Sequence, residues 1–443
     1  MYRDAMSLNT PSPTFPAIAL PQFENEALPP VMPVSLRHPD VPALPDVAAA
    51  TRAALDASRR LNALAAGARV AITCGSRGIK SKPAVVKAAV AWLKERGLDP
   101  FIVPAMGSHA GAVASGQVAL LAELGFTEEA MGCPIEASME VVRLGETSAG
   151  IPVHFDRHAF EADAVLVVGR VKSHTSFDRE VESGLTKMVA IGLGKAEGAR
   201  FVHRLGVRGY MEVLPEWAAI AIREAPVAYG IAIVENAERE AAVIEGAEPE
   251  DFYETDARLL KTAKGCIPRL PFEQIDVLAV ETLGKNISGT GMDPAVTARF
   301  DIRGRPNPPA PVISKLVVLG LTPETHGNGL GVGNADYTTK AVADSLDLYA
   351  MYMNACTATF TERVRIPAVL ATDKAALQAA VGTSWHLDGA DARLCLIRST
   401  LHLETILVSP PLAAELNGAG EVLGEAEPLR FDDAGRLLTR CPI

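Results

Sequence analysis

The sequence has few cysteines and no closely spaced pair among them. Its 443 residues contain six cysteines, none of them in a C-x-x-C arrangement. Iron–sulfur clusters, structural zinc sites and disulfide frameworks depend on such spacings, so we expect none of them.

Long apolar runs and targeting signals are also missing. No run of apolar residues approaches the roughly 18–20 that a membrane-spanning helix needs. The N-terminus is rich in proline and lacks the basic stretch followed by an apolar stretch that marks a secretory signal. We therefore expect a cytoplasmic protein without membrane contact.

The chain has no excess of positive charge. Its formal net charge of -11 argues against nucleic acid or an anionic membrane as the main partner. Hydrophobic residues make up 48% and charged residues 21%, the balance of a globular protein. A chain of 443 residues is too long for one ordinary core, which predicts two or three domains.

Apolar runs and helical stripes alternate along the chain. Arg69 to Thr73 predicts a buried strand, Ser81 the N-cap of a helix, and Pro100 to Pro104 the next strand. This βαβα alternation is typical of parallel sheets covered by helices. We expect an extended, proline-rich arm over residues 1–45 and a boundary between two α/β domains near residue 270.

Three loops of the first half each follow a predicted strand and carry a titratable residue. They are Gly75–Gly78 with Arg77, Gly107–Gly111 with His109, and Lys172–His174. Such loops meet at one edge of a parallel sheet. Arg77 precedes a helix start, where an anion is favoured, and its guanidinium suits a carboxylate or phosphate. The alternative is a surface arginine in a turn.

Two of these loops carry histidines in similar settings. A single histidine is more often structural than catalytic. His109 in Gly-Ser-His and His174 in Lys-Ser-His both follow strands, which favours a functional role. Two imidazoles that converge on one substrate suggest proton transfer on its two faces.

Lys187 stands before an apolar run, in S-G-L-T-K-M-V-A-I-G-L-G. Desolvation there would favour the neutral, nucleophilic amine, whereas a lysine that reaches solvent is the alternative. In the second half, Gly284–Gly291 and Thr325–Asn328 place polar residues among glycines after strands. These two segments either face a cleft or form ordinary turns.

Taken in order, these residues resemble the lactate racemase family that depends on a nickel-pincer nucleotide. Arg77 corresponds to a substrate-binding arginine of that family. His109, in M-G-S-H, and His174, in K-S-H, correspond to its two catalytic histidines. Lys187 corresponds to the lysine joined covalently to the cofactor, and His203 to the nickel ligand.

The resemblance has further implications for fold and site. It implies two α/β domains with mostly parallel sheets, over residues 46–270 and 271–410, an active-site cleft between them, and a tail, 411–443, that returns to the first domain. It implies that Arg77, Ser76 and Gly78 contact the cofactor, and that Lys285, or else Arg299, contacts substrate. The chain has E-S-G-L-T-K where lactate-active members have G-F-S-G-G-x-K, so the substrate stays open.

The resulting hypothesis is a racemase or epimerase that inverts a hydroxyl-bearing carbon of a 2-hydroxy acid or sugar acid by reversible hydride transfer. Its partners would be a small hydroxy acid and the enzymes that synthesise the cofactor. One alternative is a zinc hydrolase that uses His109, His174 and His203. The other is a non-catalytic ligand-binding protein.

Overall fold

The computed structural model describes residues 13–442, which form two compact units. One unit contains residues 39–267, and the other contains residues 268–442 together with the described residues up to 38. The division falls close to the predicted boundary near residue 270. The cleft expected between two domains stays a prediction.

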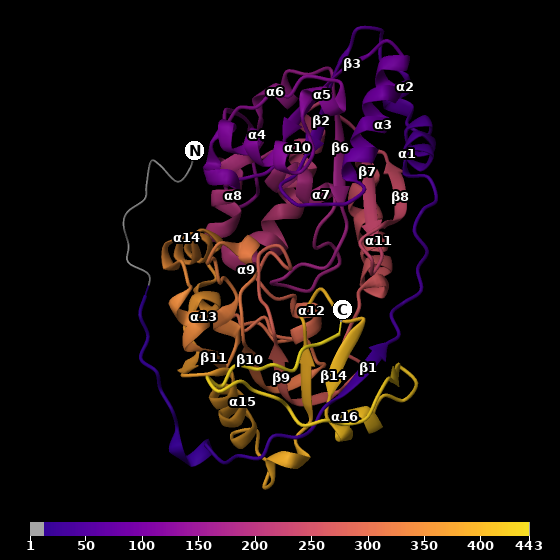
Figure 1. The fold of residues 1–443 in the computed structure, drawn as a ribbon. Helices are drawn as coiled ribbons and strands as arrows, with labels where there is room; N and C mark the ends of the chain where they lie inside the picture. The colour runs from indigo at the N-terminus through magenta and orange to yellow at the C-terminus, as the bar shows by residue number, and fades with distance from the viewer. Residues whose placement is uncertain (1–12, 443) are drawn as a thin grey trace. The chain divides into compact units, whose positions relative to one another are not determined.

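The unit of residues 39–267 is built on a five-stranded sheet of order β3-β2-β6-β7-β8 (Figure 1). The first four strands are parallel, and β8 is antiparallel to β7. The strands are β2 (Arg69–Cys74), β3 (Asp99–Pro104), β6 (Ala164–Arg170), β7 (Val227–Glu235) and β8 (Ala241–Ala247).

Helices cover both faces of this sheet. Helices α1 (Val47–Asp56) and α3 (Lys82–Glu95) pack on one face and lie side by side next to β7 and β8 in Figure 1. On the other face, Gly230 of β7 lies against Leu185 and Phe252. Burial from both sides explains why β6 is a continuous apolar run rather than an alternating one.

A two-stranded hairpin and the remaining α-helices complete this unit. They are α2 (Arg59–Asn62), α4 (Ala114–Glu123), α5 (Glu128–Met131), β4 (Val141–Glu146), β5 (Pro152–Asp156), α6 (Arg157–Phe160), α7 (Leu185–Lys187), α8 (Lys195–Arg204), α9 (Gly206–Arg208), α10 (Leu214–Glu224) and α11 (Phe252–Cys266).

The other unit contains an eight-stranded sheet of order β12-β11-β10-β9-β13-β14-β1-β15. In that order, the strands from β12 through β11, β10 and β9 to β13 are parallel. Strands β14, β1 and β15 continue the sheet in antiparallel pairs. The strands are β1 (Met32–Leu36), β9 (Gln274–Val280), β10 (Val312–Val318), β11 (Tyr337–Thr339), β12 (Ala368–Leu370), β13 (Leu394–Ile397), β14 (Thr405–Val408) and β15 (Gly420–Val422).

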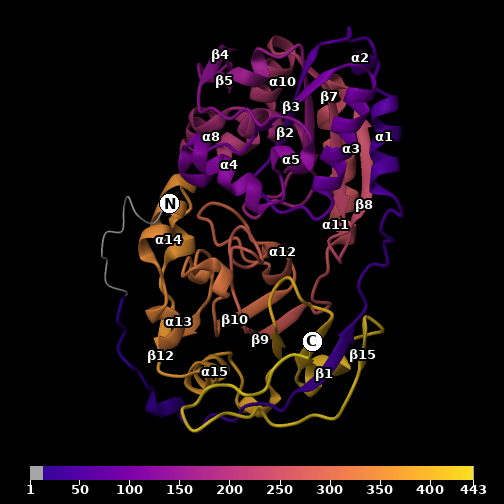
Figure 2. The ribbon, with the colours of Figure 1, turned by 45° about the horizontal axis from the view of Figure 1, so that its top comes forward.

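The longest helices of this unit are α14 and α15. Helix α15 packs against β9, β10 and β11, as Figure 2 allows the reader to follow. The helices are α12 (Pro294–Thr297), α13 (Lys340–Asp344), α14 (Leu348–Ala358), α15 (Asp373–Gly382) and α16 (Pro410–Ala414). The prediction of an α/β fold with mostly parallel sheets is confirmed.

The prediction for the two ends of the chain was wrong in part. Residues 411–443 were expected to return to the first domain, but the described tail belongs to the same unit as residues 268–410. Strand β15 pairs with β1, and Glu427 bridges to Val31. A strand at the edge of a sheet offers unpaired N–H and C=O groups, and the tail satisfies them. Residues 32–36 of the predicted arm are thus a sheet strand, whereas residues 1–12 lie outside the described part.

The expectations about membranes and cysteines can be compared with the structure directly. Over residues 13–442, no helix is both long and apolar enough to cross a bilayer. All six cysteines are free, and only Cys356 is exposed.

A fully buried ion pair ties several segments of the first unit together. The Lys195 Nζ lies 2.9 Å from Asp156 Oδ2, and both side chains are 0% exposed. The same amine donates to the carbonyl of Pro104 at 2.7 Å. Lys195 begins α8, Asp156 ends β5 and Pro104 ends β3, so one amine joins three elements.

We predict that Lys195→Met lowers the free energy of unfolding by about 3–5 kcal/mol, because it leaves the Asp156 carboxylate buried without a counter-charge. Adding Asp156→Asn should recover part of the loss, since the amide oxygen still accepts the Ala159 N–H that now caps α6. Urea denaturation measures both variants. A double variant less stable than Lys195→Met would contradict the explanation.

Candidate functional site

The strand order of the five-stranded sheet reverses between β2 and β6, so the carboxyl ends of these two strands form a topological switch point. The chain passes from β2 to β3 on one side of β2, and β6 lies on its other side. In open α/β sheets, ligands bind at such a switch point. The loops that start there are Gly75–Gly78 after β2 and Val171–Gly184 after β6, which carry Arg77 and His174.

The loop after β6 is held in place by its own side chains. Ser183 Oγ accepts the N–H of Lys172 and donates to its carbonyl, both at 2.6 Å. The buried carboxylate of Glu182 accepts the backbone N–H of His174 at 2.6 Å and that of Arg179 at 3.0 Å. Burial raises the pKa of Glu182, while its ion pair with Lys264 acts in the opposite direction.

The turn that presents Lys187 depends on a buried aspartate. Asp256 of α11 accepts the N–H groups of Leu185 and Thr186 at 2.9 and 2.8 Å, and so holds the start of α7. A Cβ on Gly184 would lie 2.0 Å from Asp256 Oδ1, and its φ of +100° also requires glycine. Burial raises the pKa of Asp256 to about 7.

The ring of Tyr210 is the common neighbour of three predicted site residues. Its centroid lies 5.3 Å from that of His174 and 5.7 Å from that of His203. The Lys187 Nζ lies 5.5 Å from the same ring. Phe177 stacks on His174 at 4.0 Å and contacts Tyr210 as well. The structure therefore gathers His174, Lys187 and His203 around one aromatic ring.

Two π-helices shape this cluster. The first, η3 (Met188–Gly192), directly follows Lys187, and the second, η4 (Gly209–Val213), contains Tyr210. Helix α8, which carries His203, lies between them. Single-turn π-helices occur frequently at functional sites, because they re-aim side chains within a helical segment.

The Lys187 amine has a strongly lowered pKa. Desolvation is the largest cause, the nearby charges of Arg77 and Lys172 add to it, and Glu182 opposes it. Together they lower the pKa of Lys187 to about 7. A large share of this amine is therefore neutral and nucleophilic near neutral pH.

His109 reaches the same region from the loop after β3. Its Nδ1 hydrogen-bonds the hydroxyl of Ser76, the residue next to Arg77. Gly107 N donates to the carbonyl of Gly192 at 3.2 Å, which joins this loop to the segment after Lys187. The buried side chain of Gln117 fixes the loop after β3, because its amide donates to the carbonyl of Gly107 at 3.1 Å.

The remaining predicted residues take other positions. Gly78 is exposed in the β2–α3 loop, with only Leu124 close to its missing side chain. Lys285 and Arg299 belong to the other unit. Arg299 pairs with Asp336 at 2.8 Å, whereas Lys285 Nζ donates to the neutral oxygens of Gly289 and Asn354. The role of either residue in substrate contact stays a prediction.

The three histidines of the zinc alternative do not form a metal-binding cluster. Within residues 13–442, no group of three or more His, Cys, Asp or Glu side chains is arranged to hold a metal ion by itself.

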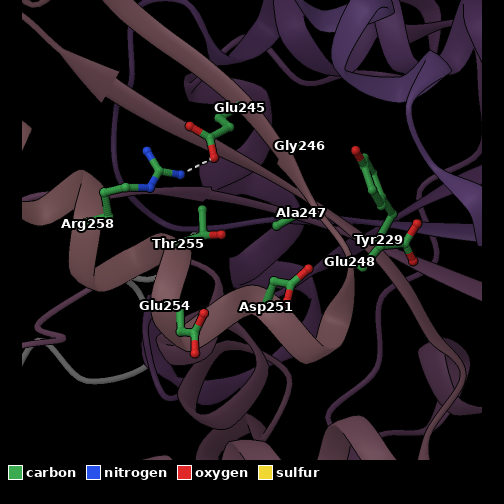
Figure 3. Close-up of a pocket in the computed structure, with 9 residues that line it drawn as sticks. All are labelled: Tyr229, Glu245, Gly246, Ala247, Glu248, Asp251, Glu254, Thr255 and Arg258. Carbon is green, nitrogen blue, oxygen red and sulfur yellow. Dashed lines mark hydrogen bonds and ion pairs between the residues drawn. The ribbon is translucent and has the colours of Figure 1, made fainter.

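A separate pocket of about 460 Å³ lies between β8 and α11 (Figure 3). None of the predicted site residues lines it. Its lining is mainly acidic, and Arg258 pairs with Glu245 across it. The negative charge of this lining makes the pocket unsuited to an anion.

Sequence reasoning missed the residues that support the site: Tyr210, Phe177, Glu182 and Asp256. Each lies next to a residue that it did identify, either in space or in the same loop. The sequence Glu182-Ser183-Gly184 before Lys187 was the one local signal that could have indicated a fixed turn, because two polar residues before a glycine often form one. Nothing local marks Asp256, which sits on a helix far along the chain.

Comparison with known proteins gives one clear match. Residues 27–210 match the family model described as the lactate racemase N-terminal domain. No curated protein matches the chain. Among solved structures, the lactate racemase apoprotein from Thermoanaerobacterium thermosaccharolyticum matches with a TM-score of 0.43 and 11% identity, over 65% of this chain and 73% of that one. That structural likeness is too low to carry an argument.

We predict that competitive labelling with acetic anhydride gives Lys187 a titration midpoint near its lowered pKa of about 7. Arg77→Gln should move this midpoint upward by roughly one unit, because removal of a like charge favours the protonated amine. Lys80→Gln, at an exposed lysine paired with Glu240, is the matched control and should leave the midpoint unchanged. An unchanged midpoint in Arg77→Gln would show that the two charges do not interact.

A second prediction concerns Asp256, whose pKa rises from 3.8 to about 7 on folding. Because the folded state binds this proton more tightly, the group contributes most stability below pH 4 and loses it as the pH rises through 7. The difference in free energy of unfolding between wild type and Asp256→Asn should fall by roughly 1.4 kcal/mol per pH unit across that window. Urea denaturation at several pH values measures it, and a constant difference would contradict the assigned burial.

Proposed function

On the premise that the chain is lactate racemase-like over residues 27–210, we propose that it is a nickel-pincer nucleotide-dependent racemase or epimerase. Its substrate would be a 2-hydroxy acid or sugar acid, inverted at a hydroxyl-bearing carbon. The observation that carries the proposal is the arrangement of His174, Lys187 and His203 around Tyr210.

The side chains fit such a cofactor. Lys187 has the neutral amine that a covalent attachment at Nζ requires, and it is more than a surface lysine because desolvation lowers its pKa. His203 offers the single imidazole that a nickel ion needs when the cofactor provides its other donors. A lone protein ligand also agrees with the lack of a three-residue metal cluster within residues 13–442. When bound, the cofactor supplies a ring that accepts and returns a hydride.

The histidines would manage the hydroxyl proton. Inversion of a hydroxyl-bearing carbon in both directions needs a group on each face that can take or give this proton. Ser76 orients the His109 ring through Nδ1, and Ser176 N donates to His174 Nδ1 at 3.2 Å. Both contacts engage Nδ1, and in this proposal the hydroxyl proton would be exchanged at Nε2 of each ring.

Other residues would bind and shield the substrate. The Arg77 guanidinium lies at the tip of its loop and can grip a carboxylate with two parallel hydrogen bonds. Phe177 and Tyr210 supply apolar surface beside His174, which excludes water from the proton-transfer step.

The test is to produce the protein together with the cofactor-synthesis enzymes. We expect bound nickel, a mass increase on Lys187, and inversion of at least one compound in a panel of hydroxy acids and sugar acids. His109→Ala and His174→Ala should each lower kcat by roughly 10²- to 10⁴-fold, since each removes a proton-transfer group.

His158→Ala is the control, because this histidine lies on α6 beside Glu136 and should not affect the rate. Full activity in protein that lacks the mass increase on Lys187 would refute the proposal. Activity that depends on zinc and survives Lys187→Ala would favour the hydrolase alternative instead.

A further inference from the structure

Two neighbouring residues at the start of α3 have buried polar atoms that the protein does not satisfy. The Lys82 side chain is only 1% exposed, and within residues 13–442 its Nζ has no hydrogen-bond partner. Ser81 is 6% exposed, and its Oγ likewise lacks a partner there. Ser81 occupies the N-cap position but makes no cap hydrogen bond.

Such a pair is costly to fold. Burial disfavours the charged amine and lowers its pKa, and the nearby Arg170 lowers it further. A buried amine or hydroxyl normally has a hydrogen-bond partner, so an unpartnered pair requires an explanation. A ligand absent from the structure provides one.

The position of the amine indicates where that ligand would lie. A Cβ on Gly75 would be 3.8 Å from Lys82 Nζ, so the amine lies directly beneath the β2–α3 loop. The same point is 3.1 Å from Met188 Cε. Met188 follows Lys187, so the loop at Gly75 borders both the Lys82 amine and the segment that carries Lys187.

The charges around the loop favour an anion. Arg77 has no ion-pair partner within the described residues, and Lys187 has none there either. Two carboxylates of this region are already engaged, because Glu235 pairs with Arg170 and Glu182 pairs with Lys264. The N-terminus of the 14-residue helix α3 adds its own positive potential.

We propose that Lys82 and Ser81, at the N-terminus of α3, form the seat of a phosphate monoester, and that Met188 moves aside when the phosphate enters. The proposal rests on the proposed function, because a pincer mononucleotide carries one such phosphate. A phosphate has three terminal oxygens and can accept from the amine, the hydroxyl and Arg77 at once, whereas a carboxylate has two. Met188, whose Cε would lie 3.1 Å from a Cβ on Gly75, directly follows Lys187, where the same nucleotide would be attached.

The experiment uses the full-length apoprotein with inorganic phosphate and ribose 5-phosphate as probes and acetate as the carboxylate comparison. Calorimetry gives the affinity and thermal unfolding gives the Tm. Both phosphate probes should raise the Tm, and ribose 5-phosphate should bind the wild type more tightly than acetate does. Lys82→Met should lower the affinity for ribose 5-phosphate roughly 10- to 100-fold, which is the effect of losing a hydrogen bond to a charged group.

Stability separates a ligand seat from a structural lysine. In phosphate-free buffer, Lys82→Met should have a Tm equal to or above that of wild type, because methionine fills the same space without a buried amine. Ser81→Ala is a milder second variant and should weaken ribose 5-phosphate binding severalfold. The control Lys80→Met changes an exposed lysine one turn away and should preserve binding.

Three outcomes would overturn the proposal. They are a Lys82→Met variant that is destabilised yet binds ribose 5-phosphate normally, an equal response to acetate and phosphate, and equal losses in Lys82→Met and Lys80→Met. None of these measurements uses nickel or turnover. Phosphate binding that depends on Lys82 in a protein that never acquires nickel would therefore leave the seat standing and refute only the proposed function.

Discussion

The excess of positive charge at the carboxyl ends of β2 and β6 is the constraint on which the rest of the site depends. Arg77, Lys82 and Lys187 lie within a small region whose carboxylates are paired elsewhere, and desolvation lowers the pKa values of both lysines. A protein that needed only stability would pair or remove these cations. Their persistence is understandable if an anionic ligand completes the region, because its charge would offset theirs.

The cations can stay close together only because the loops and helices that carry the site residues are held rigidly. Asp256 fixes the turn before Lys187, Glu182 fixes the loop of His174, and Lys195 fixes the start of the helix that carries His203. Each of these groups is itself buried and bonded to backbone or to an opposite charge. These contacts therefore prevent the cations from relaxing apart, which is the condition that pre-organised binding sites require.

The sequence was informative where local pattern determines structure. The apolar run of β6 and the apolar stripe of α3 follow from periodicity, and the position of His109 and His174 after strands follows from the same pattern. The burial of Lys82 and the reach of Asp256 from α11 to α7 depend on tertiary packing, which local pattern does not encode. The prediction for the C-terminal tail failed for the same reason, because the pairing of β15 with β1 joins opposite ends of the chain.

The two histidines differ in how tightly the structure holds them, and this difference bears on substrate choice. His174 stacks on Phe177 and its backbone is fixed by Glu182, so its ring has little freedom. His109 is exposed, and the two alanines that follow closely, Ala110 and Ala112, have left-handed φ values of 53° and 55°. Such backbone is strained in residues other than glycine, and strain of this kind is concentrated at ligand clamps and switch regions. Under the proposed function, differences in substrate shape would therefore be absorbed on the His109 side, while His174 and the ring of Tyr210 would fix the reference geometry.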